Sequence, residues 1–422
     1  MTRIDDLHYM PEFVKNKGKV IYPSEENYHN VISEWATLLQ RQYRKGLIPL
    51  FITGSGVSVP VVPTIFDIVC KLREFYNKKN NKESLVTLNK DIEELFKMLH
   101  DLSARGKKDR SIIARLLNSF QENSVLKDEW QQLNKWLLDE ILKACPTPFH
   151  QGLADIYEAI NAVCLTLNFD GLLIREFVQY RSIEGHRKRA FSLPTVEECE
   201  QFFLRTSNPG EKEAEREFLE VQIRGDILYI ECNAAGYCPQ KGTGKERSIW
   251  ASIGSFSDKP DEGKTEIIGQ KLLQCPSCGE PGISFLSFPG SYKKEKDMQN
   301  MLSIIWRFLA FRAGSVTVAG MSGEWDPLIV AFLGDLLSER EIPLLVIDEN
   351  PTKESSDFFI EEFRSPLTIE SLCTVIKGDG YIKTTCTYEA TIKWLNSVLE
   401  VADLCDQIKE KKPDLSMPES VR

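Results

Sequence analysis

The stretch Leu47-Ile48-Pro49-Leu50-Phe51-Ile52-Thr53 is a short apolar run, and Gly54-Ser55-Gly56-Val57-Ser58 ends it. A run of this length that stops at glycine is typical of a strand buried in a parallel sheet. The glycines let the backbone approach a pyrophosphate, which the amides of a following helix would face. Tight turns also need glycine without any ligand. We therefore predict a buried parallel strand with a helix directly after the turn, and nucleotide binding is one of two explanations of the glycines.

Further apolar runs repeat this pattern along the chain. Residues 162–167, 315–319 and 343–347 predict strands, and residues 327–337 predict a helix between the last two. A strand, a helix and a strand with short connections favour a parallel pair joined by a right-handed crossover. The predicted fold class is therefore α/β, with a Rossmann-like parallel sheet.

Helical spacing of apolar residues dominates the stretch 84–144, as in Trp130, Leu133, Leu137 and Ile141, and predicts a helical subdomain. The flanking sequence adds a charged insertion over 181–222. The predicted organisation is an N-terminal helical arm (1–46), a core domain (47–385) with a helical insertion (84–145) and a cysteine-rich module (226–285), and a C-terminal helix and tail (386–422).

Charge and hydropathy exclude several classes of protein. The 422 residues have 52 Lys and Arg against 62 Asp and Glu, a net charge of −10. This balance opposes a long basic surface, so we expect no direct nucleic-acid binding. No apolar run approaches the ~20 residues needed to cross a bilayer, and the first residues lack a stretch of signal-peptide length. We expect a globular, cytoplasmic chain with no membrane partner.

Polar residues follow the other predicted strands. Asn168 and Asp170 come after the second strand, where an amide can hold a ribose hydroxyl or a water and a carboxylate can accept from a carboxamide. A simple N-x-D-G turn would explain them equally. Gly320 and Ser322 follow the third strand, where they could meet a phosphate, and Asp348 ends the fourth, where it could receive an adenosine ribose.

Two close cysteine pairs stand out among the eleven cysteines of the chain. In a reducing compartment, paired cysteines indicate a metal site before a disulfide. Four thiolates make the closed tetrahedral set of a structural zinc ion, although the first pair is spaced more widely than usual. Unrelated surface thiols are the alternative. The predicted zinc ligands are Cys232, Cys238, Cys275 and Cys278.

The order of these motifs resembles that of the sirtuins over roughly residues 47–385. The chain reads G-S-G-V-S, T-L-N-F-D-G, four cysteines, G-M-S-G and V-I-D-E-N. Sirtuins show a GAGxS turn, a T-Q-N-x-D-G strand end, two cysteine pairs, a G-T-S turn and a late adenosine-binding strand. The stretch G-M-S-G-E-W-D-P looks closer to divergent sirtuin-like proteins of bacterial antiphage defence, some of which associate with a HerA-family ATPase.

This resemblance implies a role for each matching residue. Asn168 would position the attacking water or ribose, and Asp170 would hold the nicotinamide carboxamide. The residues implied to bind the rest of the dinucleotide are Gly54, Ser55, Gly56 and Ser58 at the pyrophosphate, with Gly320, Ser322 and Asp348 toward its other end.

Two departures from the sirtuin pattern bear on the chemistry. The D-F-R that follows the first proline of sirtuins is absent, since residues 62–67 read V-P-T-I-F-D, which puts the acyl-lysine geometry of a deacylase in question. The sirtuin His-Gly is replaced by Arg224-Gly225, and arginine cannot act as a base at neutral pH. His186 lies 18 residues after Asn168, close to the usual separation. We predict His186 as the base, with an exposed histidine of a basic loop as the alternative; the histidines at 8, 29, 100 and 150 show no such spacing.

The predicted function is that of an NAD⁺ glycohydrolase that forms ADP-ribose and nicotinamide, with Asn168, His186 and Asp170 as catalytic residues. The resemblance implies an abortive-infection antiphage effector, restrained as a homo-oligomer and by a HerA-family ATPase, for which the helical stretches 31–45 and 386–411 are candidate docking surfaces. Two alternatives stay open: an NAD-dependent protein deacylase, and a non-catalytic NAD or ADP-ribose-binding regulator of a partner ATPase or nuclease.

Overall fold

The structure is a computed structural model of the 422-residue chain. It describes residues 38–39, 41–42, 45–58, 61–79, 86–104, 110–159, 162–176, 189–192, 196–197, 199–200, 217–232, 282–286, 292–320, 327–340, 342, 344–348 and 373–377. The chain divides into two units, which we call the sheet unit and the helical unit. The sheet unit comprises Met1–Ser58, Pro146–Ile223 and Gln299–Arg422, and the helical unit comprises Val59–Cys145 and Arg224–Met298.

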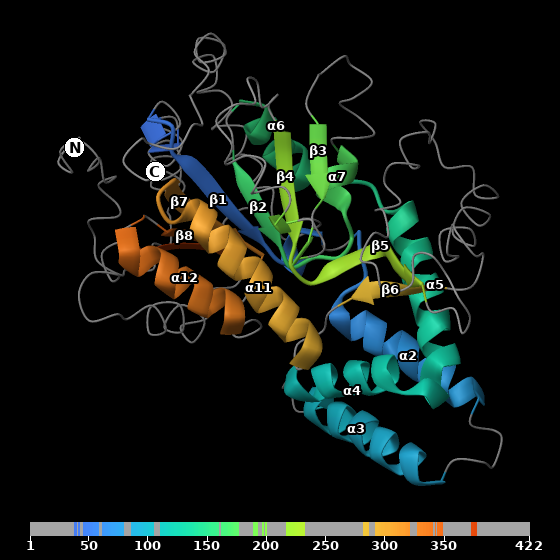
Figure 1. Ribbon diagram of the computed structural model, residues 1–422. Coiled ribbons are helices and arrows are strands. Elements are labelled where there is room, and N and C mark those ends of the chain that lie inside the picture. Colours follow the sequence, from blue (N-terminus) through green and yellow to red (C-terminus); the bar gives the residue numbers. More distant parts are fainter. Residues whose placement is uncertain are drawn as a thin grey trace. The chain divides into compact units, whose positions relative to one another are not determined.

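The sheet unit is built on a seven-stranded sheet in the order β3-β4-β2-β1-β7-β8-β9 (Figure 1). Every neighbouring pair of its strands is parallel. The α/β class and the parallel sheet are therefore confirmed. The strands are β1 (Ile48–Thr53), β2 (Val163–Thr166), β3 (Arg189–Ser192), β4 (Glu217–Gln222), β7 (Ala313–Ala319), β8 (Leu344–Asp348) and β9 (Cys373–Lys377).

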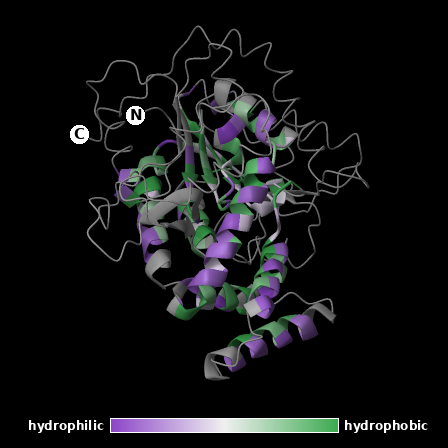
Figure 2. Ribbon diagram, turned by 90° about the vertical axis from the view of Figure 1, so that its right-hand side faces the viewer, coloured by the Kyte–Doolittle hydropathy of each residue, from purple (hydrophilic) through white to green (hydrophobic). Residues whose placement is uncertain are grey.

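Strand β1 lies in the middle of this sheet, and all six of its residues are buried. Burial on both faces explains why the sequence shows a continuous apolar run in place of an alternating one. In Figure 2 the strands are largely hydrophobic, whereas several helices carry both hydrophobic and hydrophilic residues. The helices of this unit are α6 (Pro148–Ala159), α7 (Leu172–Arg175), α12 (Pro327–Arg340) and the C-terminal part of α11 (Tyr292–Leu309).

The order of the strands creates a topological switch point between β1 and β7. After β1 the chain forms β2, β3 and β4 on one side, and it then returns to β7 on the other side. Open α/β sheets bind ligands outside the carboxyl ends of their strands at such a point. Here Gly54 N donates to Ala319 O at 3.0 Å, and Gly56 N donates to Gly320 O at 3.1 Å. The turns after β1 and β7 therefore meet at the place where this fold binds ligands.

Two strands of the sheet lie in the stretch 181–222, which we predicted as a charged insertion. Strand β4 pairs directly with β2, and β3 pairs with β4. The prediction was wrong there because Glu220 and Gln222 are buried although they are polar, which hides the apolar pattern of β4. Strand β9 was not predicted either. Residues of the predicted cysteine-rich module form β5 (Gly225–Cys232), which pairs with β6 (Gly282–Leu286) in a separate antiparallel sheet.

In the helical unit, helices occupy most of residues 65–143, and those after residue 84 agree with the periodicity over 84–144. They are α2 (Ile65–Lys79), α3 (Val86–Ala104), α4 (Arg110–Glu122) and α5 (Lys127–Lys143). On α5 the predicted apolar stripe is buried. Asp128 and Glu129 in its first turn and Lys143 in its last turn complement the helix dipole.

The helix expected directly after the glycine turn begins later than predicted. The turn itself is a short 3-10 helix, η2 (Ser55–Ser58), and α2 starts only at Ile65. Thr64 and Asp67 form the start of α2: Thr64 N donates to Asp67 Oδ2 at 2.8 Å, and Asp67 N donates to Thr64 Oγ1 at 3.3 Å. This reciprocal pair is a capping box. The segment that departs from the sirtuin D-F-R therefore begins a helix.

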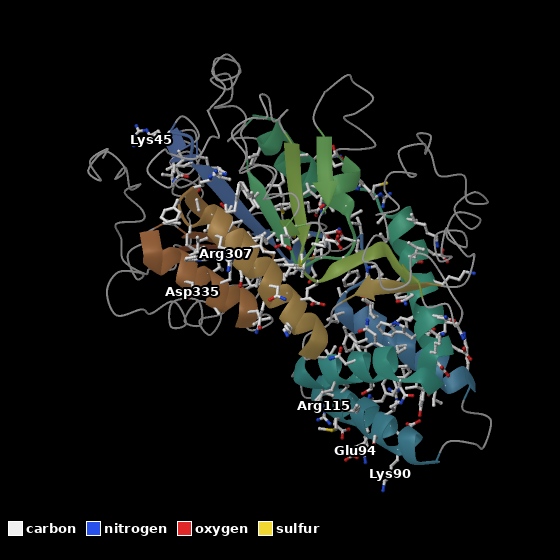
Figure 3. The ribbon with its side chains drawn as sticks, in the orientation of Figure 1. Lys45, Lys90, Glu94, Arg115, Arg307 and Asp335 are labelled. Carbon is white, nitrogen blue, oxygen red and sulfur yellow. The ribbon has the colours of Figure 1, made fainter. Side chains whose placement is uncertain are left out.

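The core of the helical unit contains a cluster of three aromatic rings. The ring centroids of Tyr76 and Phe120 lie 5.8 Å apart, and Phe96 completes the cluster at 5.7 and 6.2 Å from them. Each of the three is at most 3% exposed. By contrast, Lys90 and Glu94 on α3 extend away from the helices (Figure 3). Packing of aromatic rings thus joins α2, α3 and α4.

The described residues of the predicted N-terminal arm pack within this chain. Residues 38–39 and 41–42 are helical, and Leu38 and Leu39 are buried. Gln42 Nε2 donates to Gly314 O at 2.6 Å. These residues are therefore part of the core; the stretch 386–411 lies outside the described residues. None of the described helices combines the length and the apolar character that crossing a membrane requires.

Replacing Gly314 with alanine is expected to lower the free energy of unfolding by about 1–3 kcal/mol. A Cβ atom there would lie 2.8 Å from Gln42 Cδ and 3.0 Å from Leu47 Cβ, and Gln42 is held by its hydrogen bond. Gly334→Ala in α12 is the matched control, since no atom lies within 4 Å of that position. Alanine favours a helix by about 0.5–1 kcal/mol, so the control should be stabilised. Denaturant unfolding would measure both, and shifts of equal sign would contradict this account.

Candidate active site

Asn168 follows β2, and its side-chain amide links the ends of β1 and β2. Its Nδ2 donates to Gly54 O and to Ser58 Oγ, both at 3.0 Å. These two acceptors use both amide protons, which fixes the orientation of the amide. Its Oδ1 is buried and has no hydrogen-bond partner among the described residues. The residue is only 6% exposed. Asn168 therefore holds the two turns together, and among the described residues nothing donates to its acceptor oxygen.

Asp170 lies two residues further along and is also buried. Its Oδ1 accepts from Leu172 N at 3.0 Å, across Gly171 with a positive φ of 60°. Burial raises the pKa of Asp170, whereas the Leu172 amide, the Ser58 hydroxyl and Arg175 oppose that rise. The carboxyl group of Asp170 thus belongs to the same cluster of polar side chains as Ser58 and Asn168.

His150 reaches the other side of Ser58 from the start of α6. Its Nε2 lies 3.5 Å from Ser58 Oγ, and its Nδ1 accepts from Thr147 N at 3.1 Å. Thr147 precedes Pro148, the first residue of α6, and Thr147 O accepts from Gln151 N at 3.1 Å. Thr147 Oγ1 lies 2.7 Å from His150 Nδ1 and donates to Val57 O at 3.2 Å. His150 therefore caps α6 with one nitrogen and faces the glycine turn with the other.

The sequence did not identify His150 as a site residue, because its distance along the chain from Asn168 does not match the usual spacing of the base. The T-P-x-H pattern at 147–150 does mark a helix start, with threonine at the cap and proline after it. Burial, followed by the charge of Arg175, lowers the pKa of His150 from 6.5 to about 3. Near neutral pH this imidazole is therefore uncharged. A side chain with such a low pKa is a poor general base at that pH.

Burial of neutral His150 makes stability depend on pH. Because its pKa is lower in the folded state, its contribution is complete above the unfolded value of 6.5 and is lost as pH falls toward about 3. We expect the free energy of unfolding to fall by about 2 kcal/mol between pH 7 and pH 5 from this residue. Asp170 acts in the opposite sense, so the parent must be compared with His150→Gln, which retains Asp170. Denaturant unfolding at both pH values should show a shallower decline in the variant, and equal declines would contradict this assignment.

Four predicted site residues form one group at the carboxyl ends of β1 and β2: Gly54, Ser58, Asn168 and Asp170. Gly56 and Gly320 add the backbone bond that joins the turn after β7. Gly320 has a positive φ of 64°, which favours glycine at this turn.

The other predicted residues are placed as follows. Ser55 is exposed at the first position of η2, and Asp348 is the last residue of β8. Arg224 is buried in the turn between β4 and β5. His186, Ser322, Cys238, Cys275 and Cys278 lie outside the described residues, and Cys232 ends β5. Within the part of the chain that is described, no group of three or more His, Cys, Asp or Glu could hold a metal ion.

No protein-family model matches the sequence, and no curated protein matches it significantly. Among solved structures, the chain is similar to a Sir2 mutant with a p53 peptide and NAD, at 12% identity and a TM-score of 0.35. That similarity covers 87% of this chain and 99% of the other. A second similar structure is a mutant Sir2 homologue in complex with ADP-ribose, at 14% identity and a TM-score of 0.37, with 87% and 98% covered. At these values, what this chain does must be inferred from its own residues.

Proposed function

We propose that the protein is an NAD⁺ glycohydrolase that cleaves the bond between nicotinamide and ribose. One observation supports this most directly: at the carboxyl ends of β1 and β2, beside the switch point of the sheet, the Asn168 amide is locked against Gly54 and Ser58 while its buried Oδ1 has no partner among the described residues. A buried acceptor without a donor costs free energy, which a bound water or hydroxyl would recover. Water is the second substrate of the proposed reaction.

The proposed chemistry assigns one task to each residue. Nicotinamide leaves with the electron pair of its bond to C1′ of the ribose, and water attacks C1′ from the opposite face. Asn168 Oδ1 accepts a hydrogen bond from this water and orients it, and His186 takes its proton. Asp170 accepts from the carboxamide N–H. The products are ADP-ribose, nicotinamide and a proton.

The dinucleotide itself would lie along the turns after β1 and β7. The Gly54–Ser58 turn and Gly320 meet through backbone hydrogen bonds. Gly54 N and Gly56 N are engaged in these bonds, and Val57 N donates to Gly54 O, so the glycines would serve here by letting the backbone approach the pyrophosphate closely. Ser55, Ser322 and Asp348 complete the proposed binding set.

The test is to incubate the purified protein with NAD⁺ and no acylated peptide, and to analyse the products. Formation of ADP-ribose and nicotinamide in equal amounts is the expected result. Nicotinamide release that requires an acyl-peptide would instead show a deacylase. Binding of NAD⁺ without turnover, alone and with a co-purified partner, would show a regulator and overturn the proposed hydrolysis.

We propose in addition that four cysteines hold a structural zinc ion. Antiparallel pairing places Cys232 opposite Gly282, which follows Cys278 by four residues. The end of β5 and the start of β6 lie side by side, so this end of the strand pair can bring both cysteine pairs together. Four thiolates satisfy a tetrahedral zinc ion and leave no open position, so the ion would support the fold and activate no water.

Metal analysis of the purified chain is expected to find one zinc ion per chain, and Cys278→Ser is expected to lose most of it. Cys70→Ser is the matched control, because Cys70 is an exposed free thiol on α2. Equal zinc contents in the two variants would contradict the proposed ligand set.

We also propose that the activity is restrained by assembly, as expected for an abortive-infection antiphage effector whose reaction would harm the cell that contains it. The resemblance to HerA-associated sirtuin-like proteins supports a homo-oligomer and a HerA-family ATPase partner. Light scattering coupled to size-exclusion chromatography, with and without the co-expressed ATPase, would test both. A monomer at micromolar concentration that does not bind the ATPase would contradict this proposal.

A further inference from the structure

The protons of the Ser58, Asn168 and His150 side chains can be assigned from their contacts. The backbone N–H of Thr147 has a fixed direction and points to His150 Nδ1, which must therefore present a lone pair. A neutral imidazole has one N–H, which then resides on Nε2 and faces Ser58 Oγ. Ser58 Oγ also receives an N–H from Asn168 Nδ2.

Two donors thus converge on Ser58 Oγ, so its own proton must point elsewhere. The Asp170 carboxylate is the nearby acceptor that the Ser58 hydroxyl stabilises. The hydroxyl of Ser58 is in this way oriented from both sides. An oriented Ser58 in turn keeps one N–H of Asn168 bound, and Gly54 O keeps the other.

We propose that His150 is a positioning residue, which acts as an Nε2–H donor to Ser58 and thereby holds the Asn168 amide with its oxygen toward the reacting water. The proposal deepens the NAD⁺ glycohydrolase function and rests on it. His150 touches neither substrate nor water in this scheme. Its contribution to the rate passes through Ser58 and Asn168.

The cap of α6 is a competing role for His150, and two substitutions separate the roles. In His150→Asn, the amide oxygen can accept from Thr147 N at the place of Nδ1, but the side chain is too short to reach Ser58. In His150→Gln, the longer amide can place an N–H near the position of Nε2. The first variant retains the cap alone, whereas the second can retain the donor to Ser58.

Steady-state kinetics of NAD⁺ cleavage should therefore distinguish these variants. We expect His150→Asn to lower kcat by about 10-fold with KM changed by less than about twofold, and His150→Gln to stay within about threefold of the parent. His100→Asn, at an exposed histidine on α3, is the matched control and should leave both constants unchanged. Equal losses of kcat in the two His150 variants would overturn the proposal. Losses of kcat that follow only the loss of stability in each variant would also overturn it, because His150 would then act as a helix cap alone.

A measurement without NAD⁺ keeps this proposal separate from the proposed reaction. The ¹⁵N chemical shifts of the His150 imidazole should show the Nε2–H form near neutral pH. The Asn168 side-chain amide protons, assigned by their absence in Asn168→Asp, should exchange with solvent about 10-fold faster in His150→Asn than in the parent. An Nδ1–H form, or unchanged exchange, would overturn the positioning role. Absence of NAD⁺ cleavage with the expected shifts and exchange would instead reject only the reaction.

Discussion

Replacing Asn168 with alanine is expected to lower the rate of NAD⁺ cleavage by at least ~100-fold, because the attacking water loses the group that orients it. The substitution also removes the two hydrogen bonds that join Gly54 and Ser58 to the end of β2. Asn168→Asp keeps the size of the side chain and an acceptor oxygen, but it loses both N–H donors. We expect Asn168→Asp to be nearly as inactive as Asn168→Ala, since the turn after β1 is then no longer held.

Asn134→Ala is the matched control for this prediction. Asn134 is a buried asparagine of α5 in the helical unit, and neither atom of its amide group has a partner among the described residues. Its removal breaks no described hydrogen bond and should leave NAD⁺ cleavage within about twofold of the parent. Product formation over time by chromatography would measure all three variants. A rate for Asn168→Ala equal to that of Asn134→Ala would reject the proposed site.

Replacing Phe120 with alanine is expected to cost about 3–5 kcal/mol of stability in the helical unit. Phe120 is fully buried, and its ring makes edge contacts with Tyr76 and Phe96. Alanine would leave a cavity among three helices and remove both aromatic contacts. Denaturant unfolding and hydrogen exchange of α2, α3 and α4 would measure this loss.

Phe311→Ala provides the control for Phe120→Ala with the same change in side-chain size. Phe311 is 68% exposed, so its removal should change the free energy of unfolding by no more than about 0.5 kcal/mol. A loss for Phe120→Ala as small as that for Phe311→Ala would contradict the packing of the aromatic cluster.

The pattern of apolar residues along the sequence predicted those parts of the fold in which the buried residues are apolar. Strands β1, β2, β7 and β8 are short apolar runs because they lie inside a parallel sheet, and their predicted ranges agree with the structure to within two residues. The apolar stripe of α5 likewise identified its buried face. Where polar residues are buried, as Glu220 and Gln222 are in β4, the pattern failed.

The sequence likewise predicted part of the candidate site, namely the residues that follow the buried strands. Parallel strands end at one edge of their sheet, so residues that directly follow β1 and β2 had to lie near each other. Gly54, Ser58, Asn168 and Asp170 do so. His150 belongs to α6 and follows no strand, and nothing in its local sequence indicates the contact with Ser58.

By itself, the sequence determined the succession of apolar strands and glycine turns, because each of these depends on residues that are close neighbours along the chain. Only the tertiary structure decided which polar groups meet. Ser58 lies 92 positions from His150 and 110 from Asn168, yet its hydroxyl contacts both. Which nitrogen of His150 has the proton, and which way the Asn168 amide points, depend on donors and acceptors from separate turns and helices, and the order of residues cannot specify such geometry.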